Sequence, residues 1–329
     1  MAVADQLAAE YRTLTEACGL VDRSQRGKLA LTGPGARAFL NGQVTNDVLA
    51  LNPGEGCYAA FLTPKGKMLG DLRVLVLAPG DAPEPSDPEA PTLLLDTERV
   101  ALQALFDMIR RFRVGYAVEL HKRTVERGLL SLVGPEARAL IAAPDLPRLE
   151  HANRAASIGG AAVVLVATDV GVDVWCEAAR VDGVRAELEG AGAVAVSEAS
   201  AECLRVEHGR PRYGVDSDDS TIPQEAGLNE RAVSFTKGCY VGQETVARLH
   251  WRGRPNRHLR GLLLSDPLPA GAELTLGERV VGRLSSVVSS PVLGPIGLAL
   301  LRREVAPGEL LHTPACAATA RVVELPFRG

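Results

Sequence analysis

The sequence predicts an α+β fold in which one strand–turn–helix unit occurs twice and an all-β barrel follows. Three observations predict this fold. A fifteen-residue motif recurs at 26–40 and 127–141. Alternating apolar segments, typical of half-buried strands, are interspersed with segments of helical periodicity. From about Asn256 the chain changes to short apolar runs separated by glycine and proline, which is typical of a small barrel or sandwich. At about 150 residues per domain, the 329 residues allow two or three domains.

The repeated motif reads RGKLALTGPGARAFL in the first copy and RGLLSLVGPEARALI in the second, with nine of fifteen positions identical. Each copy is an alternating apolar stretch, then Gly-Pro, then an Ala/Arg/Leu run, which indicates a strand, a turn and a helix. The motif therefore predicts two pseudo-equivalent α+β units. The alternative is a chance match in a chain rich in alanine, glycine and arginine.

Between the two copies we expect four strands and one helix. The strands cover 57–62, 71–77, 92–96 and 114–120, the helix covers 98–112, and a turn at 63–67 joins the first two strands. Five prolines fall within the thirteen residues 79–91, and proline cannot donate to a sheet ladder. This stretch therefore predicts a solvated loop.

After the second copy the pattern predicts strands, helices and then the barrel. The strands cover 161–167 and 171–176, and the helices cover 181–189 and 198–207. Gly190 ends the first of these helices. The expected barrel strands cover 259–264, 278–282, 285–288, 295–301 and 320–325.

The composition excludes several classes of protein. With 46% hydrophobic and 23% charged residues, the chain is neither disordered nor collagen-like. Its net charge of −4 disfavours a general nucleic-acid coat. The six cysteines show no CxxC pair or zinc-ligand spacing, so we expect free thiols and no bound metal. No apolar run approaches the roughly 18 residues of a membrane span, and the N-terminal segment lacks the pattern of a signal peptide, so we expect a cytoplasmic protein.

The segment Phe235–Glu244, FTKGCYVGQE, is the sharpest local pattern. Cys239 stands between glycines, and Lys237 lies two residues before it. A nearby ammonium group favours the thiolate, which is the reactive form of cysteine. The segment indicates either a loop that presents one activated thiol or a buried structural cysteine beside a turn.

Two charged features of the sequence, one ion pair and one cluster of arginines, are open to more than one interpretation. Arg205 and Glu207 fall on the helix predicted over 198–207, where the pair is either a carboxylate-binding site or a surface ion pair. The arginines between Arg248 and Arg260 surround Trp251. This cluster is compatible with single-stranded nucleic acid, with a phosphate or polyglutamate tail, or with a solvated basic linker.

Lys237–Glu244, KGCYVGQE, resembles the signature K-G-C-[FY]-x-G-Q-E of the YgfZ-type folate-binding proteins. These proteins are related to the T-protein, the aminomethyltransferase of the glycine cleavage system. The resemblance extends to the N-terminal segment from Leu20 to Val48, to the hairpin PKGKMLGDL over 64–72, and to LRVEHGRPRYG over 204–214. It covers most of residues 10–260.

The resemblance implies a three-domain cloverleaf around a central hole that binds tetrahydrofolate or a derivative. We expect a folate-binding α+β domain from residues 1–52 plus 124–250. Residues 53–123 would form an inserted α+β domain, and residues 255–329 the C-terminal β-barrel.

The resemblance also implies roles for individual residues. Asp71 matches the T-protein aspartate beside the folate nitrogen that receives the one-carbon unit, although T-proteins usually have two consecutive acids where this chain has Gly70-Asp71. Asp173 matches an acid that holds the pterin ring, with a shorter side chain. The other folate-binding positions implied by the matched motifs are Arg205, Tyr213, Lys237 and Gln243.

The function implied is that of a tetrahydrofolate-binding accessory protein in iron–sulfur cluster assembly or repair, with Cys239 as the functional thiol. Its partners would be iron–sulfur client enzymes or assembly factors, and not a membrane. A single cysteine cannot hold a cluster through four thiolates, so transient ligation or thiol exchange is expected. The alternative is a tetrahydrofolate-dependent aminomethyl- or methyltransferase with Asp71 as the catalytic group. Nucleic-acid binding through the Arg248–Arg260 cluster is a third, weaker hypothesis.

Overall fold

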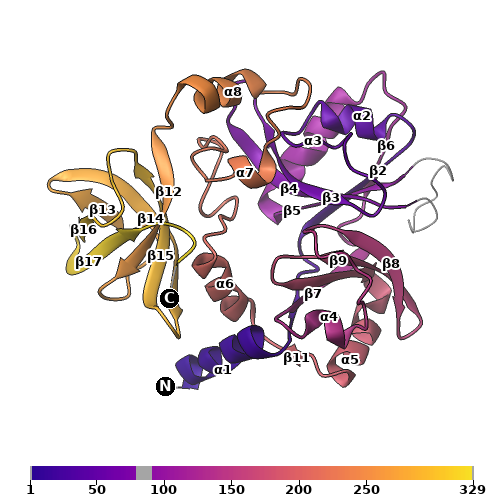
Figure 1. Cartoon of the computed structure of the whole chain (residues 1–329), viewed down its shortest axis with the longest axis horizontal. Helices are drawn as coiled ribbons and strands as arrows, with labels where there is room; N and C mark the ends of the chain where they lie inside the picture. The colour runs from indigo at the N-terminus through magenta and orange to yellow at the C-terminus, as the bar shows by residue number, and fades with distance from the viewer. Residues whose placement is uncertain (1, 79–90, 328–329) are drawn as a thin grey trace.

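The computed structural model describes residues 2–78 and 91–327. The proline-rich segment expected at 79–91 lies outside the described residues except for Pro91. Two mixed α/β lobes lie side by side, and a separate barrel packs beside them (Figure 1). The predicted α+β class with a C-terminal barrel is confirmed, because the last six strands close on themselves.

Each mixed lobe is built on one sheet. The first sheet has the order β11 (Val194–Ala195), β1 (Gly19–Asp22), β7 (Arg127–Val133), β10 (Gly171–Glu177), β9 (Ala161–Ala167) and β8 (Asn153–Ile158). The second has the order β3 (Gly56–Leu62), β4 (Met68–Val76), β5 (Leu93–Thr97), β2 (Gly27–Thr32) and β6 (Glu119–Lys122). The inner strands β2, β5 and β7 are rich in Leu and are buried along nearly their whole lengths, as expected where both faces of a sheet are covered.

The two copies of the sequence repeat form β2 with α2 (Ala36–Asn41) and β7 with α4 (Ala137–Leu140), one in each sheet. Each copy pairs with the strand that precedes the other copy. Strand β1 precedes β2 but pairs with β7, and β6 precedes β7 but pairs with β2. The two sheets therefore exchange a strand reciprocally.

Equivalent residues of the two copies adopt the same backbone conformation or make the same kind of hydrogen bond. Gly33 and Gly134 both adopt a positive φ, and a Cβ on either would lie 2.5 Å or less from a backbone oxygen, of Ala117 and Ala17 respectively. Only glycine fits both conditions. The guanidinium groups of Arg37 and Arg138 each donate to backbone carbonyls of the loop that follows their own helix. The repeat is thus a structural duplication and not a chance match.

Apolar residues of both sheets meet in a shared interface centred on Trp175, which is 2% exposed. Each lobe also has its own core, covered by helices. Besides α2 and α4, the α-helices of the described residues are α1 (Ala2–Glu16), α3 (Leu102–Phe112), α5 (Val181–Gly190), α6 (Glu198–Glu207), α7 (Asn229–Ala232) and α8 (Gln243–Arg252). None of the helices in the described part of the chain is both long and apolar enough to cross a membrane.

The prediction of a strand over 114–120 is wrong for most of these residues. Residues 113–118 form a turn in which the Tyr116 amide donates to the Arg113 carbonyl, and Gly115 adopts a positive φ of 90°. Strand β6 begins only at Glu119. The other elements expected from the pattern between 57 and 207 occur within a few residues of their predicted ends.

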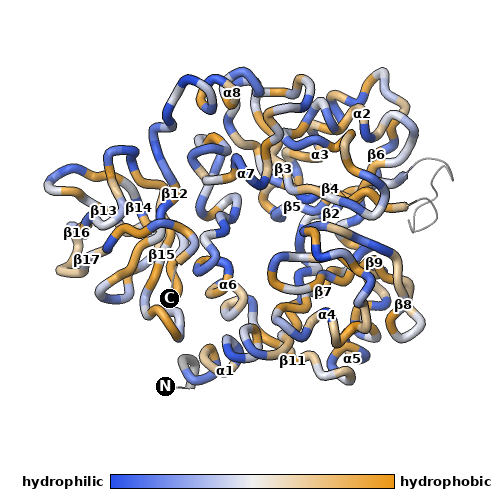
Figure 2. Tube along the Cα trace, in the orientation of Figure 1, coloured by the Kyte–Doolittle hydropathy of each residue, from blue (hydrophilic) through white to orange (hydrophobic). Residues whose placement is uncertain are grey.

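The barrel is formed by β12 (Arg257–Leu264), β15 (Gly294–Arg302), β14 (Arg279–Ser290), β13 (Glu273–Leu276), β16 (Leu310–Thr313) and β17 (Cys316–Val323), in that order around it. The two runs expected at 278–282 and 285–288 are one continuous strand, β14. Helix α6 packs against β14 and β15, and so joins the barrel to the two sheets. Helix α8, which lies just before the barrel in sequence, consists largely of hydrophilic residues (Figure 2). In agreement with this, Val246 is its single buried residue.

Candidate functional site

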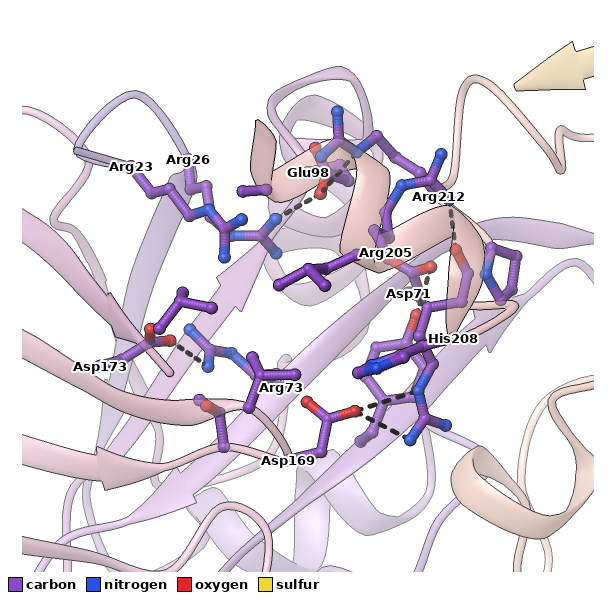
Figure 3. Close-up of a pocket in the computed structure, with 18 of the residues that line it drawn as sticks. Arg23, Arg26, Asp71, Arg73, Glu98, Asp169, Asp173, Arg205, His208 and Arg212 are labelled. Carbon is purple, nitrogen blue, oxygen red and sulfur yellow. Dashed lines mark hydrogen bonds and ion pairs between the residues drawn. The ribbon is translucent and has the colours of Figure 1, made fainter. Parts of the chain in front are cut away.

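A cavity of about 270 Å³ opens where the two sheets and α6 meet. Its walls come from segments far apart in the sequence, and charged side chains of both signs dominate them (Figure 3). The residues used below are Arg26, Tyr58, Asp71, Arg73, Asp173, Arg205, Arg212 and Tyr213. We call this cavity the central pocket.

Asp71 lies on β4 and is 4% exposed, yet its carboxylate lines the central pocket. The Tyr58 hydroxyl on the neighbouring strand β3 donates to Asp71 Oδ2 at 2.6 Å. Burial raises the pKa of Asp71 to about 6, although the Tyr58 hydrogen bond and the Arg26 charge oppose the rise. A carboxylate with this pKa can both accept and donate a proton near neutral pH.

The packing around position 70 explains why a glycine, and not a second acidic residue, precedes Asp71. A Cβ at position 70 would lie 2.6 Å from the ring of Phe61 and 2.6 Å from the Cβ of Ala101. Phe61 and Ala101 are fully buried, so neither can move aside cheaply. The local packing therefore excludes any side chain at 70, and the pocket holds a single aspartate at this point of β4.

Three residues of a buried chain of alternating charges, Arg26, Arg73 and Asp173, line one wall of the pocket. Asp96 on β5 accepts hydrogen bonds from Arg26 and Arg73, and Arg73 Nη1 donates to Asp173 Oδ2 at 2.5 Å. Burial alone would raise the pKa of Asp96, but the two guanidinium groups hold it at about 2. Because Arg73 is on β4 and Asp173 on β10, this chain ties the two sheets together (Figure 3).

Asp173 is held from both sides. The Ser131 hydroxyl donates to its Oδ1 at 2.6 Å, and Arg73 occupies its Oδ2. Each carboxylate oxygen can accept a further hydrogen bond, so the group can still meet a ligand in the pocket. The sequence identified Asp173 but gave no sign of Arg73, the residue that fixes it.

Arg205 lines the pocket but has no free donor. Its five N–H groups go to Glu202, Asp216, Ser286 and the carbonyl of Arg210. Since Ser286 belongs to the barrel and Arg205 to α6, this arginine holds the barrel in place. Its expected role as a folate contact stays a prediction, and the geometry gives it a structural task.

Arg212 is the arginine with spare capacity. One of its terminal nitrogens, Nη2, binds Glu198 and Glu202 at 3.0 Å, while its buried Nε lies 4.0 Å from Glu98 Oε1 and has no hydrogen-bond partner. An unpartnered buried donor costs free energy unless a ligand or water meets it. Tyr213, the next residue, is buried at the same wall, and burial raises the pKa of its phenol.

Cys239, Lys237 and Gln243 lie outside the central pocket. Cys239 is exposed. The Lys237 ammonium donates to the backbone carbonyls of Asn41, Val44 and Asn46 at 2.5–2.9 Å, and burial lowers its pKa to about 8. Lys237 therefore fastens the loop to the second lobe, and its charge is directed at carbonyls and not at the Cys239 sulfur.

The glycines of the KGCYVGQE segment fit it against the hairpin that carries Asp71. Gly242 adopts a φ of 84°, and a Cβ there would lie 2.6 Å from the carbonyl oxygen of Thr63. A Cβ at Gly66, in the same hairpin turn, would lie 2.8 Å from the Cβ of Thr245. Gln243 then begins α8 and is half-buried. The two glycine-containing motifs seen in the sequence are thus two sides of one contact.

The arginine cluster around Trp251 is divided in the structure. Arg257 pairs with Glu225, and Arg260 pairs with Glu324. Trp251 is 70% exposed beside the stacked rings of Phe235 and His250. The cluster is therefore not one continuous basic surface.

The structure brings together four of the seven predicted site residues: Asp71, Asp173, Arg205 and Tyr213. The residues that the sequence missed are chiefly Arg26, Arg73 and Tyr58. Arg26 opens the first repeat copy, but a repeat gives no hint of function. No group of three or more metal-ligating side chains occurs in the described ranges 2–78 and 91–327.

Comparison with known proteins gives one consistent answer. The model of the GCVT N-terminal domain family matches residues 1–237. An aminomethyltransferase of Rubrobacter xylanophilus is 28% identical, with 98% of this chain and 86% of that protein covered. An aminomethyltransferase of Streptomyces avermitilis is also 28% identical, over 91% of this chain and 82% of its own.

The fold has a close counterpart among solved structures. The aminomethyltransferase T of the glycine cleavage system from Bartonella henselae superposes with a TM-score of 0.85. The match covers 98% of this chain and 89% of the other, at 24% sequence identity. The arrangement of the two sheets and the barrel is therefore that of a known fold.

Proposed function

Because this chain belongs to the GCVT N-terminal domain family, we propose that it binds tetrahydrofolate in the central pocket and uses Asp71 in transfer of an aminomethyl unit. The observation that carries the proposal is the buried Asp71 carboxylate, which lines the pocket with a pKa of about 6. The names of the relatives, aminomethyltransferase, support the same chemistry.

The pocket residues suit the ring system of a reduced folate. A volume of about 270 Å³ is at the lower end of small-molecule sites, which suits a bicyclic ring and leaves the remainder of the ligand to extend outward. Asp71 and Asp173 can accept from N–H groups of the ring, and the unpartnered Arg212 Nε can donate to a carbonyl or carboxylate. Val133, Val170 and Leu204 supply apolar contact.

The bound folate would supply the ring nitrogen that takes up the one-carbon unit. Asp71 is mostly ionised at pH 7, since its pKa is about 6. When the new carbon–nitrogen bond forms, the bond between the transferred carbon and its donor breaks and the donor group leaves with the electron pair. The Asp71 carboxylate can take the proton that the folate nitrogen gives up in this step. Tyr58 fixes the carboxylate by its 2.6 Å hydrogen bond, and the surrounding burial keeps water away from it.

Binding should be saturable and independent of Cys239. Tetrahydrofolate titrated anaerobically into the protein, followed by calorimetry, should give the same affinity for the wild type and for Cys239→Ser, because Cys239 lies outside the pocket. Absence of binding by the wild-type protein would overturn the proposal. A loss confined to Cys239→Ser would move the site to the KGCYVGQE loop.

Replacing Tyr58 with phenylalanine should shift the pH dependence of the transfer rate to higher pH. The Tyr58 hydrogen bond lowers the pKa of Asp71, so its removal lets burial raise that pKa above about 6. The acidic limb of the rate–pH profile for aminomethyl transfer to tetrahydrofolate should shift to higher pH. An unchanged limb would mean that Asp71 does not titrate in the reaction.

We propose as a second candidate the accessory role in iron–sulfur protein assembly or repair, with Cys239 as its thiol. What favours it is the exposure of Cys239 on a loop anchored by Lys237, while four other cysteines are buried. Cells carrying Cys239→Ser should then lose activity of iron–sulfur enzymes. Cys316→Ser is the matched control, because Cys316 is the second exposed cysteine of the described residues. Equal enzyme activities in both strains would contradict this role.

A further inference from the structure

A second, shallower pocket lies where the barrel meets the hairpin turn between β3 and β4. Its volume is about 810 Å³, and it shares no lining residue with the central pocket. It is lined by Lys67, Ser220, Glu225, Asn256, Arg257, Arg279, Arg302, Arg303 and Glu304. We call it the barrel pocket.

The barrel pocket concentrates positive charge on an acidic protein. Five of its lining residues are basic and two are acidic, an excess of three positive charges, whereas the whole chain has a net charge of −4. Like charges gathered in one concave surface repel each other and attract anions. The net charge of this pocket is therefore opposite in sign to that of the whole chain.

The strand register enforces this concentration. Arg257 on β12 stands directly opposite Arg302 on β15 in the antiparallel ladder. Like charges at directly opposed positions destabilise a sheet. Glu225 neutralises the charge of Arg257, with 2.9 Å between Glu225 Oε2 and Arg257 Nη2. The charge of Arg302 must therefore be balanced by another group of the pocket.

The second carboxylate is shared between two arginines. Glu304 Oε1 lies 2.9 Å from Arg279 Nη1 and 3.0 Å from Arg302 Nε. One carboxylate therefore balances two guanidinium groups, both of which are about half exposed. Each guanidinium has five donors, so most of the donors remain available.

Arg303 and Lys67 complete the set of donors. The Arg303 side chain is exposed and has no partner among the residues that the structure describes, while its backbone amide donates to the Asn256 carbonyl. Lys67 uses its ammonium on the carbonyl of Ser220 and retains two further donors. The side chains thus converge from the hairpin turn and from the edge of the barrel.

We propose that the barrel pocket is a binding site for a small polyanion that carries several phosphate or carboxylate groups. Arg279, Arg302 and Arg303 supply forked donors that match such groups, and Lys67 supplies a point charge. The site is separate from the central pocket, so it does not depend on the function proposed for Asp71.

Two probes distinguish the possible sources of the anion. Inorganic tripolyphosphate and tetra-γ-glutamate are titrated separately into the full-length protein by calorimetry, in a low-salt buffer without phosphate. We expect saturable binding of at least one probe, weakened by added salt. The probe that binds more tightly identifies phosphate or carboxylate as the natural group.

Three variants test whether the pocket is responsible. Hydrogen bonds to charged groups contribute about 1.5–3 kcal/mol, so Arg303→Ala should weaken binding by about tenfold or more. Glu304→Gln keeps the acceptor for Arg279 and Arg302 but removes the competing charge, and should tighten binding. Arg321→Ala is the matched control, since Arg321 is exposed on β17 of the same barrel and lies outside the pocket.

The proposal fails if neither probe binds saturably. It also fails if Arg303→Ala and Arg321→Ala weaken binding equally, because the attraction would then be non-specific. Calorimetry with tetrahydrofolate on the same Arg303→Ala protein should give the wild-type affinity, which separates the two sites and confirms that the variant is folded.

Discussion

Asp71→Asn should abolish aminomethyl transfer to tetrahydrofolate and, at pH 7, make the protein more stable. The amide keeps the shape of the carboxylate and can still accept the Tyr58 hydrogen bond, but it cannot take up a proton. We therefore expect tetrahydrofolate still to bind, more weakly because one charged acceptor is lost, while the rate falls at least a hundredfold, the lower end of the contribution of general acid–base catalysis, about 10²–10⁴. Single-turnover rates and calorimetry measure the two effects separately.

The gain in stability follows from the sign of the pKa shift. Burial raises the pKa of Asp71 from 3.8 to about 6, so the folded protein favours the neutral acid. The wild-type free energy of unfolding therefore falls as pH rises from about 4 to 6 and stays lower above that. This rise in the pKa corresponds to a penalty of roughly 3 kcal/mol on the folded state at pH 7, which the asparagine variant avoids.

Urea unfolding at two pH values tests this account. The variant should be more stable than the wild type at pH 7, and the difference should shrink toward zero at pH 4, where the wild-type acid is already largely protonated in the folded state. Equal stability at pH 7 would mean that the fold does not penalise the Asp71 charge. Retained transfer activity would show that another group moves the proton.

Arg73→Met should produce the largest loss of stability. It removes the cation between Asp96 and Asp173, whose carboxylates remain buried without it. Breaking a buried ion pair by removal of one partner costs about 3–5 kcal/mol. Urea unfolding at pH 7 should show a loss of this size.

A double-mutant cycle with Asp173→Asn isolates the contact between the two sheets. If the Arg73–Asp173 bond stabilises the fold, the losses of the single variants should sum to more than the loss of the double variant. Additive losses would contradict a direct coupling. Arg110→Met is the matched control, because Arg110 pairs with Asp107 on the exposed surface of α3 and should cost no more than about 1 kcal/mol.

The local structure was accessible from the sequence because it rests on short-range patterns. Short apolar runs bounded by turn residues identified β3, β5, β9 and β10, and the Gly/Pro-separated runs identified the barrel. The turn at 113–118 was missed because its apolar residues Val114, Tyr116 and Val118 alternate as in a strand. The pattern does not record that Gly115 reverses the chain there.

The site was only partly accessible, for a different reason. Asp71 and Asp173 stand in motifs that resemble those of a family, and the structure places both at the central pocket. Arg73 was missed because an arginine at one position of an apolar strand is typical of a solvent-facing side chain, and only the pairing of β4 with β5 shows that it meets Asp96. Lys237 was expected to act on Cys239 because the two are only two residues apart in sequence, whereas the hydrogen bonds of its ammonium go to a loop almost 200 residues earlier.

The reciprocal pairing of β1 with β7 and of β6 with β2 also determines when the protein can fold during its synthesis. Strand β1 ends at Asp22 and must wait on the ribosome until the chain has grown past Arg127, where its partner begins. The second sheet, meanwhile, stays open at one edge until β6 emerges. A cut between β5 and β6 would separate β1 from its partner β7 and β6 from its partner β2, so neither fragment would hold a complete sheet. Because the walls of the central pocket come from both halves, the nascent protein has no binding site until the exchange is complete.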